Sequence, residues 1–569
     1  MWRRTAAVLG AATALATSAL TVSSASSAGA ATTPLPSVSG VTATVSGTSA
    51  TVGWTAPAGE PADVVYVVGA ADAQQGWLTT RLCTNGCTSL TWDGLRANEA
   101  YQFGVAPWSP STNNWGNGVG SPVVTTSDPL CAANVVSGHV CLGVDASSNL
   151  GTENHAGSGL LHGVLASTST STLSTFKLQS MRVGALASQE DAAAAATGAS
   201  LTLVLSDAWW AQTYSSARRT AASPWSNWTA YTSFVTKSVQ TAEAAGYTNV
   251  YWDIQNEPET AGYYDPSAPA SSTNVLQQYL VAYNAIKSVD ANAKIIGPSI
   301  DYNINYAAYP VDMRRFLDFA AANNLHFDAL SWHENVDGGT ADQQPQMIAD
   351  HVAEVRGYLA RYPALGNPPI FVNEYSGQAG GVVPGWIVGY LANLDKAGVA
   401  QANHSCFGTG CSSTIDGLVT SSGATTAAGV TYQTYASMTG RRLSWTSGDD
   451  HVDAVAIADS SNVVHLLIGR SQVCPSWAAS GCPKSSSASA ADTVDLAVGG
   501  LGAATSATIA LSTLPSSSAA LAAAKAGTTQ TVTVTNGVAK VSLPSLSDGG
   551  AFVVTVTATT GTSTTSTRR

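Results

Sequence analysis

The chain has 569 residues, of which 45% are hydrophobic and only 11% are charged, so it is too long for one core and too apolar for a disordered tail. Lys and Arg total 24 against 36 Asp and Glu, with no basic cluster, which excludes the electrostatic footprint of nucleic-acid binding. The 15 Trp and 19 Tyr, in a chain poor in charge, favour an exported protein whose ligand is neutral.

The N-terminus has the pattern of an export signal. Two arginines precede an apolar run that ends near Val22, and Ala28-Gly29-Ala30 supplies the small residues of a cleavage site. The run is shorter than the roughly 20 apolar residues that a membrane anchor needs. We therefore predict that residues 1–30 are a signal peptide, that the protein is secreted, and that it has no membrane partner.

The cysteines fall in close pairs along the sequence. The pairs are Cys83/Cys87, Cys131/Cys141, Cys406/Cys411 and Cys474/Cys482. In an exported chain such spacings favour local disulfides. Zinc binding is the alternative, but Cys83/Cys87 and Cys406/Cys411 lack a second matching pair nearby, so no metal is expected.

Residues 34–126 alternate between apolar and polar side chains in short runs that are separated by Gly and Pro turns, which predicts a small β-sandwich. Trp54 stands where a core tryptophan would, and a leucine precedes Tyr101 by six residues. This pattern resembles a fibronectin type III module with Tyr101 as its corner tyrosine. Trp108, Trp115 and the Asn-rich loop between them either bind sugar or decorate a spacer module.

From residue 132 to 430, short apolar runs alternate with segments of helical periodicity. The runs predicted as strands are 141–144, 180–183, 201–205, 250–254, 294–297, 329–332, 370–372 and 399–402. Between the third and fourth runs, apolar side chains from Trp228 to Ala242 line one helical face that ends at Gly246. Eight alternations predict a parallel sheet with right-handed crossovers, closed into a (β/α)8 or TIM barrel.

Runs of strand character return after residue 431. They lie at 452–457, 463–468, 493–498, 507–511, 530–535, 539–543 and 552–556. They predict a second β-sandwich over residues 431–556, and the Thr/Ser-rich residues 557–569 predict a disordered tail.

Carboxyl groups follow two strands of the predicted barrel. Asn256-Glu257-Pro258 comes after the fourth strand, and Asn373-Glu374-Tyr375 comes after the seventh. The active sites of such barrels form at the carboxyl ends of the strands. Because hydrolysis of a glycosidic bond needs two carboxyl groups flanking it, one of them as an acid, Glu257 and Glu374 are candidate catalytic residues.

Asn256-Glu257-Pro258 together with Phe371-Val372-Asn373-Glu374-Tyr375 resembles clan A of the glycoside hydrolases. This resemblance implies that Glu257 is the general acid/base and Glu374 the nucleophile. The resemblance further implies that Asn256 forms a hydrogen bond with the sugar 2-hydroxyl. Arg182, at the second strand, resembles the clan arginine that stabilises the nucleophile. A barrel with a trailing β-sandwich is most similar to family 39 and neighbouring families.

Other side chains at the strand ends are candidates for binding substrate. The candidate substrate-binding residues are Asn256, Arg182, His333, Trp209, Trp210, Asp207, His404 and Tyr375. His333 follows the sixth strand, where family members carry a His or Tyr near the nucleophile. Trp209 or Trp210 either stacks on a sugar or packs against the following helix. His404 and Asp207 stand where clan members often carry Trp and His, which leaves the sugar in the first subsite open.

Two other chemistries fit the sequence less well. A metal site built from His333, Glu334, Asp337 and His351 lacks a His-x-x-x-His register, and residues 157–159 lack the Gly-x-Ser-x-Gly form of a serine hydrolase. No cofactor is expected.

The catalytic acid must begin protonated, and the charge of Glu374 nearby is expected to raise the pKa of Glu257.

The sequence therefore predicts a secreted, retaining glycoside hydrolase that acts on a neutral oligosaccharide or polysaccharide. The resemblance favours a β-xylosidase-like specificity. An endo-acting glycanase of the same clan is one alternative, and a non-catalytic carbohydrate-binding or adhesive protein on an inactive barrel is the other.

Overall fold

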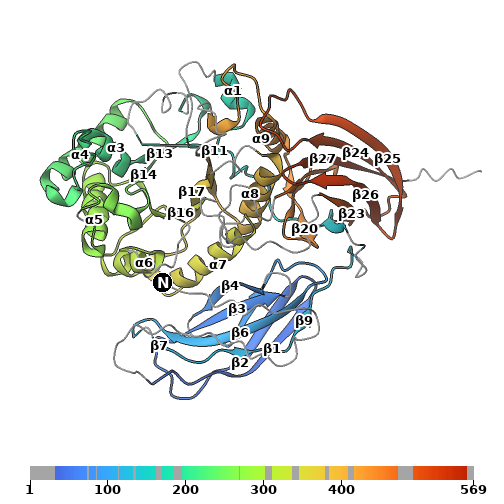
Figure 1. Cartoon of the computed structure of the whole chain (residues 1–569), viewed down its shortest axis with the longest axis horizontal. Helices are drawn as coiled ribbons and strands as arrows, with labels where there is room; N and C mark the ends of the chain where they lie inside the picture. Colours follow the sequence, from blue (N-terminus) through green and yellow to red (C-terminus); the bar gives the residue numbers. More distant parts are fainter. Residues whose placement is uncertain are drawn as a thin grey trace, which may run out of the picture.

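The structure is a computed structural model, and the residues that it describes run from 33 to 560 with internal gaps. The gaps are 73–75, 85, 113, 132–135, 137, 162–169, 185–191, 193–194, 268–269, 302–309, 336–344, 378–382, 408–414 and 472–490. The expected signal peptide lies outside this part of the chain. Within the described residues, no helix is long and apolar enough to cross a membrane. Figure 1 shows an N-terminal pair of sheets, a barrel wrapped by helices and a C-terminal sheet region.

The N-terminal module consists of two sheets. One sheet contains β1 (Ser39–Ser46), β2 (Ser49–Thr55) and β5 (Ser89–Trp92). The other contains β3 (Val65–Asp72), β4 (Gly76–Cys83) and β6 (Ala100–Ser109), with the short strands β7 (Asn114–Trp115), β8 (Val119–Gly120) and β9 (Val124–Thr125) paired to β6. Trp54 and Tyr66 pack edge to face in the core between the sheets. The hydroxyl of Tyr101 accepts a hydrogen bond of 3.0 Å from the backbone N–H of Arg96, as a corner tyrosine does.

This module packs against both other parts of the molecule. Arg81 forms an ion pair of 2.9 Å with Asp350 in α7 (Ile348–Leu359), on the barrel side. Arg96 forms another, of 3.1 Å, with Asp450, in the turn between two C-terminal strands. Figure 1 shows the module lying along α7. The described surface of this module that faces the barrel is therefore an interface between domains. Such an interface does not fit a module that serves only as a spacer.

The barrel is closed by parallel strands in chain order, so the (β/α)8 prediction is confirmed. Its strands are β11 (Gly159–Leu160), β12 (Ser180–Val183), β13 (Ser200–Val204), β14 (Val250–Asp253), β15 (Lys294–Ile300), β16 (Ala329–Asn335), β17 (Ile370–Gly377) and β18 (Gln401–Cys406). The last seven contain or overlap the runs predicted as strands two to eight.

The first barrel strand was predicted wrongly. The run 141–144 lies in β10 (His139–Asp145), which pairs with β23 and β20 of the C-terminal sheet. Part of the segment assigned to the barrel, residues 132–430, thus belongs to that sheet. Two features explain the error. A strand that is buried on both faces is a continuous apolar run whichever sheet it joins. The first barrel strand, β11, has only two residues, which is too short to give such a run.

Helices surround the barrel strands. They are α1 (Thr170–Thr175), α3 (Leu205–Thr213), α4 (Trp228–Ala244), α5 (Ser272–Val289), α6 (Met313–Ala322), α7, α8 (Pro384–Ala397) and α9 (Ala427–Ser437). Asn227 caps α4 by accepting a hydrogen bond from the Ala230 N–H. The helix ends before Gly246, whose φ of 77° needs glycine, as the periodicity predicted.

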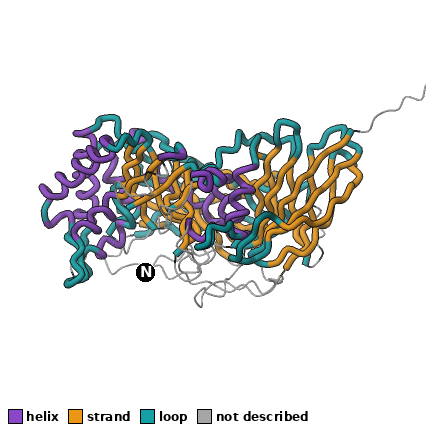
Figure 2. The backbone as a smooth tube through the Cα atoms, turned by 90° about the horizontal axis from the view of Figure 1, so that it is seen from above, coloured by secondary structure: helices purple, strands orange, loops and turns teal. Residues whose placement is uncertain are grey.

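The C-terminal strands join β10 in one ten-stranded sheet in the order β19-β21-β22-β27-β24-β25-β26-β23-β10-β20, and this strand-rich region (Figure 2) is consistent with the predicted sandwich. The strands are β19 (Arg441–Arg442), β20 (Ser444–Ser447), β21 (Val452–Ala458), β22 (Val464–Arg470), β23 (Ala491–Gly499), β24 (Ser506–Leu514), β25 (Lys525–Thr535), β26 (Val538–Ser547) and β27 (Ala551–Thr559). β27 extends three residues into the predicted tail, and residues 561–569 lie outside the described part.

Disulfides close two of the predicted local loops. Cys83 is bonded to Cys87, and Cys131 to Cys141. Cys406 is also disulfide-bonded. The pairing of Cys406 with Cys411 and of Cys474 with Cys482 stays a prediction, because Cys411, Cys474 and Cys482 lie outside the described residues.

Candidate active site

A buried arginine organises the polar side chains at the carboxyl ends of the barrel strands. Arg182, on β12, is 2% exposed. It donates hydrogen bonds of 2.6 Å to Glu374 Oε1, 2.9 Å to Asp253 Oδ2 and 2.7 Å to Asn256 Oδ1. The guanidinium holds three acceptors, two from β14 and the residues just beyond it and one from β17, in one fixed geometry, as its planar fork allows. The predicted contact between Arg182 and the candidate nucleophile is present in the structure.

Glu257 lies just beyond β14, at a sharp turn of the backbone. Its φ of 45° is in the left-handed region, which costs a non-glycine residue about 1 to 3 kcal/mol. The turn is held because the N–H of Glu257 donates to the carbonyl of Ser299 at 2.9 Å and its own carbonyl accepts from the N–H of Thr260 at 2.8 Å. The strained turn aims the Glu257 side chain across the mouth of the barrel, where it is 32% exposed.

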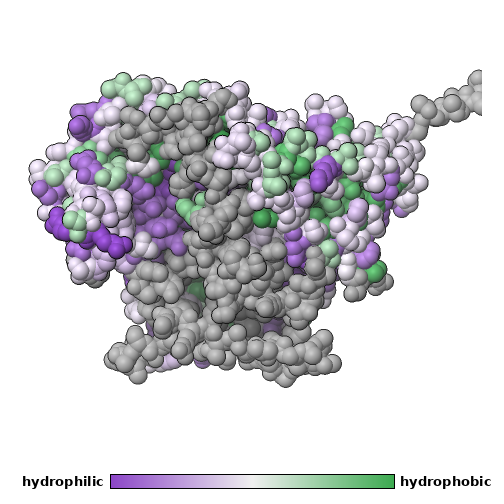
Figure 3. Space-filling model, turned by 45° about the horizontal axis from the view of Figure 1, so that its top comes forward, coloured by the Kyte–Doolittle hydropathy of each residue, from purple (hydrophilic) through white to green (hydrophobic). Residues whose placement is uncertain are grey.

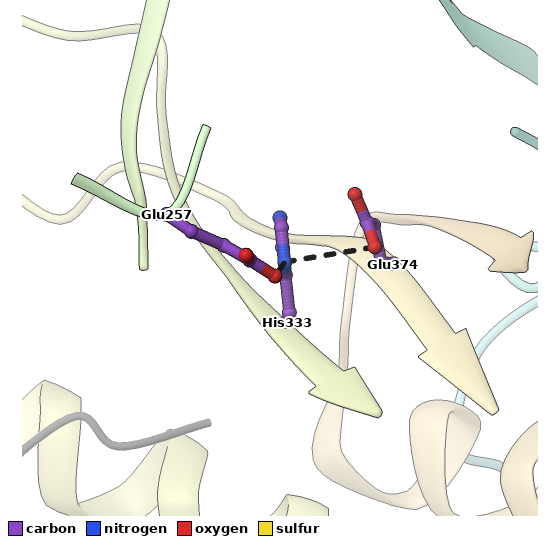
Figure 4. Close-up of side chains that lie close together, drawn as sticks. All are labelled: Glu257, His333 and Glu374. Atoms are coloured by element: carbon purple, nitrogen blue, oxygen red, sulfur yellow. Dashed lines mark hydrogen bonds and ion pairs between the residues drawn. The ribbon is translucent and has the colours of Figure 1, made fainter. Parts of the chain in front are cut away.

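His333 stands between the two glutamates (Figure 4). Its Nδ1 lies 3.2 Å from Glu257 Oε1 and 3.7 Å from Glu374 Oε2, and the ring is fully buried. An oxygen of Glu257, a nitrogen of His333 and an oxygen of Glu374 all lie within 4.8 Å of one another. The structure thus brings together both candidate catalytic residues and one candidate substrate-binding residue.

The electrostatics of this trio differ from the expectation. Burial lowers the pKa of His333, but the charge of Glu374 and the hydrogen bond to Glu257 together raise it to about 9. Burial also raises the pKa of Glu257, yet the hydrogen bond and charge of His333 outweigh burial and lower it overall. The predicted rise in the pKa of Glu257 was wrong, because the sequence did not reveal a cation between the two carboxylates.

The same three side chains are the one group, within the described residues, whose ligand atoms are close enough to hold a metal ion. The charges around these three side chains suit a proton better than a metal ion. Arg182 already occupies Glu374 Oε1, and His333 is protonated at neutral pH, so two positive charges oppose a metal ion there. Of the metal set considered from sequence, His351 contacts Glu334 at 3.0 Å, His333 instead faces Glu257, and Asp337 lies outside the described residues.

Several site residues were not singled out from the sequence. Asn335 Nδ2 donates to Glu374 Oε2 at 3.1 Å, and its own Oδ1 accepts from Ser405 at 3.0 Å. Asn373 Nδ2 donates to Asp253 Oδ2 at 3.0 Å. Asn335 could have been found from the period of two along β16, because it lies on the same strand face as His333.

Asp207 stands at the start of α3 beside the arginine. Burial raises its pKa to about 6, against the opposing charge of Arg182. A side chain at Gly184, which follows β12, would collide with Asp207, so the missing Cβ makes room for this carboxyl group. Asp207 thus lies close enough to Arg182 and Glu374 to interact with their charges, and its role in binding substrate stays a prediction.

The two neighbouring tryptophans differ in their surroundings. Trp209 is 4% exposed, donates to the carbonyl of Ala222 at 2.6 Å and packs edge to face on Tyr231 of α4. For Trp209 these contacts favour packing against the following helix over stacking on a sugar. Trp210 is half-buried and packs against Tyr214, which is 40% exposed, with ring centroids 4.5 Å apart. For Trp210 both alternatives, stacking on a sugar and packing against the protein, stay open.

Tyr375 and His404 are fully buried beneath the mouth. The Tyr375 hydroxyl donates to the carbonyl of Gly157 at 2.5 Å, and the ring lies edge to face with His404 at 5.6 Å. His404 also packs against Tyr432. Neither side chain is exposed, and both pack on neighbouring aromatic rings, so their contact with substrate stays a prediction.

The aromatic pair of the N-terminal module is likewise enclosed. Trp108 is 3% exposed and stacks on Trp115 at 5.4 Å between ring centroids. The guanidinium of Arg314, from α6, lies 5.3 Å from the Trp108 ring. The pair belongs to the interface with the barrel, which argues against the sugar-binding alternative.

Comparison with known proteins shows the fold. No protein-family model matches the sequence, and no curated protein matches it either. Among solved structures, the protein N2152 from Neocallimastix frontalis is 18% identical with a TM-score of 0.58, covering 74% of this chain and 100% of its own. A glucosidase from Croceicoccus marinus is 14% identical with a TM-score of 0.54, covering 75% of this chain and 100% of its own. The barrel and C-terminal sheets are thus a known architecture.

Proposed function

We propose that this protein is a retaining glycoside hydrolase in which Glu374 is the nucleophile and Glu257 the general acid/base. The observation that carries the proposal is that two glutamates, one just beyond β14 and one on β17, have carboxylate oxygens within 4.8 Å of each other. Retaining glycosidases hold their carboxyl groups about 5 to 5.5 Å apart, whereas inverting enzymes need roughly 6.5 to 9.5 Å to admit a water. The shorter separation favours retention.

The hydrogen bonds around each glutamate support the two roles. Glu374 has one oxygen held by Arg182 and the other by Asn335, so its carboxyl group is fixed in the orientation that a nucleophile needs. Glu257 is the more exposed of the pair, at 32% against 7% for its side chain, which suits a group that must meet a leaving group and then water. Asn256 is held by Arg182 next to them, in position for a sugar hydroxyl.

The substrate class follows from the charges at the mouth. Arg182 and His333, the cations of the described site, are both paired with carboxylates, so no cation is left to attract an anionic sugar. Hydrophilic side chains gather in a hollow on the barrel half of the molecule (Figure 3). We propose a neutral oligosaccharide or polysaccharide as substrate, acted on outside the cell, with β-xylosides as the first specificity to test. The glucosidase among the similar structures makes glucosides the second specificity to test.

Trapping of the covalent intermediate tests the proposal. A panel of aryl glycosides and polysaccharides first identifies the substrate, and product sizes then separate exo from endo action. Glu374→Gln should lower turnover by several orders of magnitude, whereas Glu243→Gln, on the exposed face of α4, should retain it. A fluorinated slow substrate should label the peptide that contains Glu374. Label on another carboxylate would overturn the assignment, and sugar binding without any turnover would support the non-catalytic alternative.

A further inference from the structure

We propose that His333 holds the proton that Glu257 delivers to the leaving group, so that the two side chains act together as one acid. This inference rests on the proposed function and adds a positioning residue to it. The geometry is direct, because the 3.2 Å separation of His333 Nδ1 and Glu257 Oε1 is a hydrogen-bond distance and the ring is fully buried.

Before the reaction, the two carboxylates that face the ring favour a proton on Nδ1. An unprotonated Nδ1 would turn its lone pair toward the carboxylates of Glu257 and Glu374, at 3.2 and 3.7 Å. Nε2 has no hydrogen-bond partner among the described residues, so the polar contacts of the ring pass through Nδ1. One proton is therefore shared between a nitrogen and a carboxylate oxygen, and it can lie on either atom.

The charged groups that face the ring come from three strands and one turn. Glu374 on β17 and Glu257 beyond β14 favour the protonated ring, while Arg182 on β12 opposes it. Asp253, at the end of β14, also interacts with the charge of His333. The balance places the pKa of His333 at about 9, so the proton is on the ring at neutral pH.

The first chemical step can then be written with every atom accounted for. A carboxylate oxygen of Glu374 forms a bond to the anomeric carbon as the glycosidic C–O bond breaks, and its electron pair goes to the leaving oxygen. That oxygen takes a proton from Glu257, and Glu257 takes the proton from His333 Nδ1. His333 ends neutral with its hydrogen on Nε2, Glu257 ends as a carboxylate, and Glu374 ends as an uncharged ester.

Ester formation itself promotes this transfer. The negative charge of Glu374 is the first of the influences that raise the pKa of His333, and the ester has no such charge. The ring therefore gives up its proton at the moment when the leaving group needs one. In the second step Glu257 takes a proton from the attacking water, Glu374 regains its charge, and the proton returns to His333.

A pH profile separates this role from a structural one. In His333→Asn the amide can still donate to Glu257 but cannot carry the shared proton. For a substrate with a poor leaving group, the alkaline limb of kcat/KM should move to lower pH by about 1 to 3 units. An activated aryl glycoside, which needs little protonation, should show a much smaller movement. Asn335→Ala, on the same strand and also in contact with Glu374, should lower the rate without moving the limb. An unmoved limb in His333→Asn would overturn the proposal.

Imidazole NMR of the isotopically labelled full chain tests the same point without turnover. The imidazole signal that is absent from the spectrum of His333→Asn is that of His333. If that variant does not fold, the signal that shifts in Glu257→Gln assigns it instead. The His333 signal should titrate near pH 9 in the unaltered protein and about 1 to 3 pH units lower in Glu374→Gln. A neutral ring at pH 7, or no change in Glu374→Gln, refutes the shared proton. Absence of glycoside turnover in the unaltered protein would instead refute the proposed function.

Discussion

Replacing Arg182 by Gln should destabilise the protein in a manner that depends on pH. The substitution leaves two nearly buried carboxylates, Asp253 and Glu374, without the cation that binds both. Removing one partner of a buried ion pair costs about 3 to 5 kcal/mol of unfolding free energy. We expect a loss of this size at neutral pH.

The sign of the pH dependence follows from Asp253. Burial raises its pKa, and Arg182 is the first influence that opposes the rise. Without Arg182 the folded protein keeps a proton on Asp253 that the unfolded chain releases above its usual pKa of about 3.9. The folded state then binds more protons than the unfolded state, so the stability of Arg182→Gln falls as pH rises. The loss relative to the unaltered protein should be small near pH 4 and largest near pH 7.

Urea unfolding followed by tryptophan fluorescence at both pH values measures this difference. Arg218→Gln, at an exposed position after α3, is the matched control and should change the unfolding free energy by less than about 0.5 kcal/mol. An equal loss for Arg182→Gln at both pH values would refute the electrostatic reasoning and would point to lost packing alone.

Three further predictions concern the reaction and the turn beyond Glu257. Glu257→Ala should slow substrates with poor leaving groups far more than activated aryl glycosides, and azide should partly restore the second step; equal losses on both substrate types would count against the acid/base role. Proton NMR of the first product, recorded before mutarotation, should show the anomer of the substrate, and the opposite anomer would contradict the nucleophile role of Glu374. Glu259 is 4% exposed, and burial raises its pKa to about 8. Between about pH 4.3 and pH 8 the folded state therefore holds a proton on Glu259 that the unfolded chain has released, so the free energy of unfolding falls as pH rises. Glu259→Gln should therefore become more stable relative to the unaltered protein over that range, by up to about 1.4 kcal/mol per pH unit, and a constant difference would show that Glu259 does not carry this dependence.

Local signals were enough to predict much of the barrel and its two glutamates. Short apolar runs followed by polar side chains identify the carboxyl ends of strands. This rule located Glu257 and Glu374 because each lies within three residues of the end of such a run. The C-terminal strands could be predicted for a similar reason, since alternation along a strand is set by its own residues.

Only the tertiary structure decided which partners these local elements meet. The apolar run in β10 is the same whether it pairs with barrel strands or with β23, and long-range hydrogen bonds make that choice. From the sequence, Trp209 is a candidate for stacking on a sugar, but in the structure it packs on Tyr231 and donates a hydrogen bond to the carbonyl of Ala222. The contact between His333 and Glu257 joins residues 76 positions apart, and it reverses the expected direction of the Glu257 pKa. A pKa depends on charges a few ångströms away in space, and sequence separation does not reveal those distances.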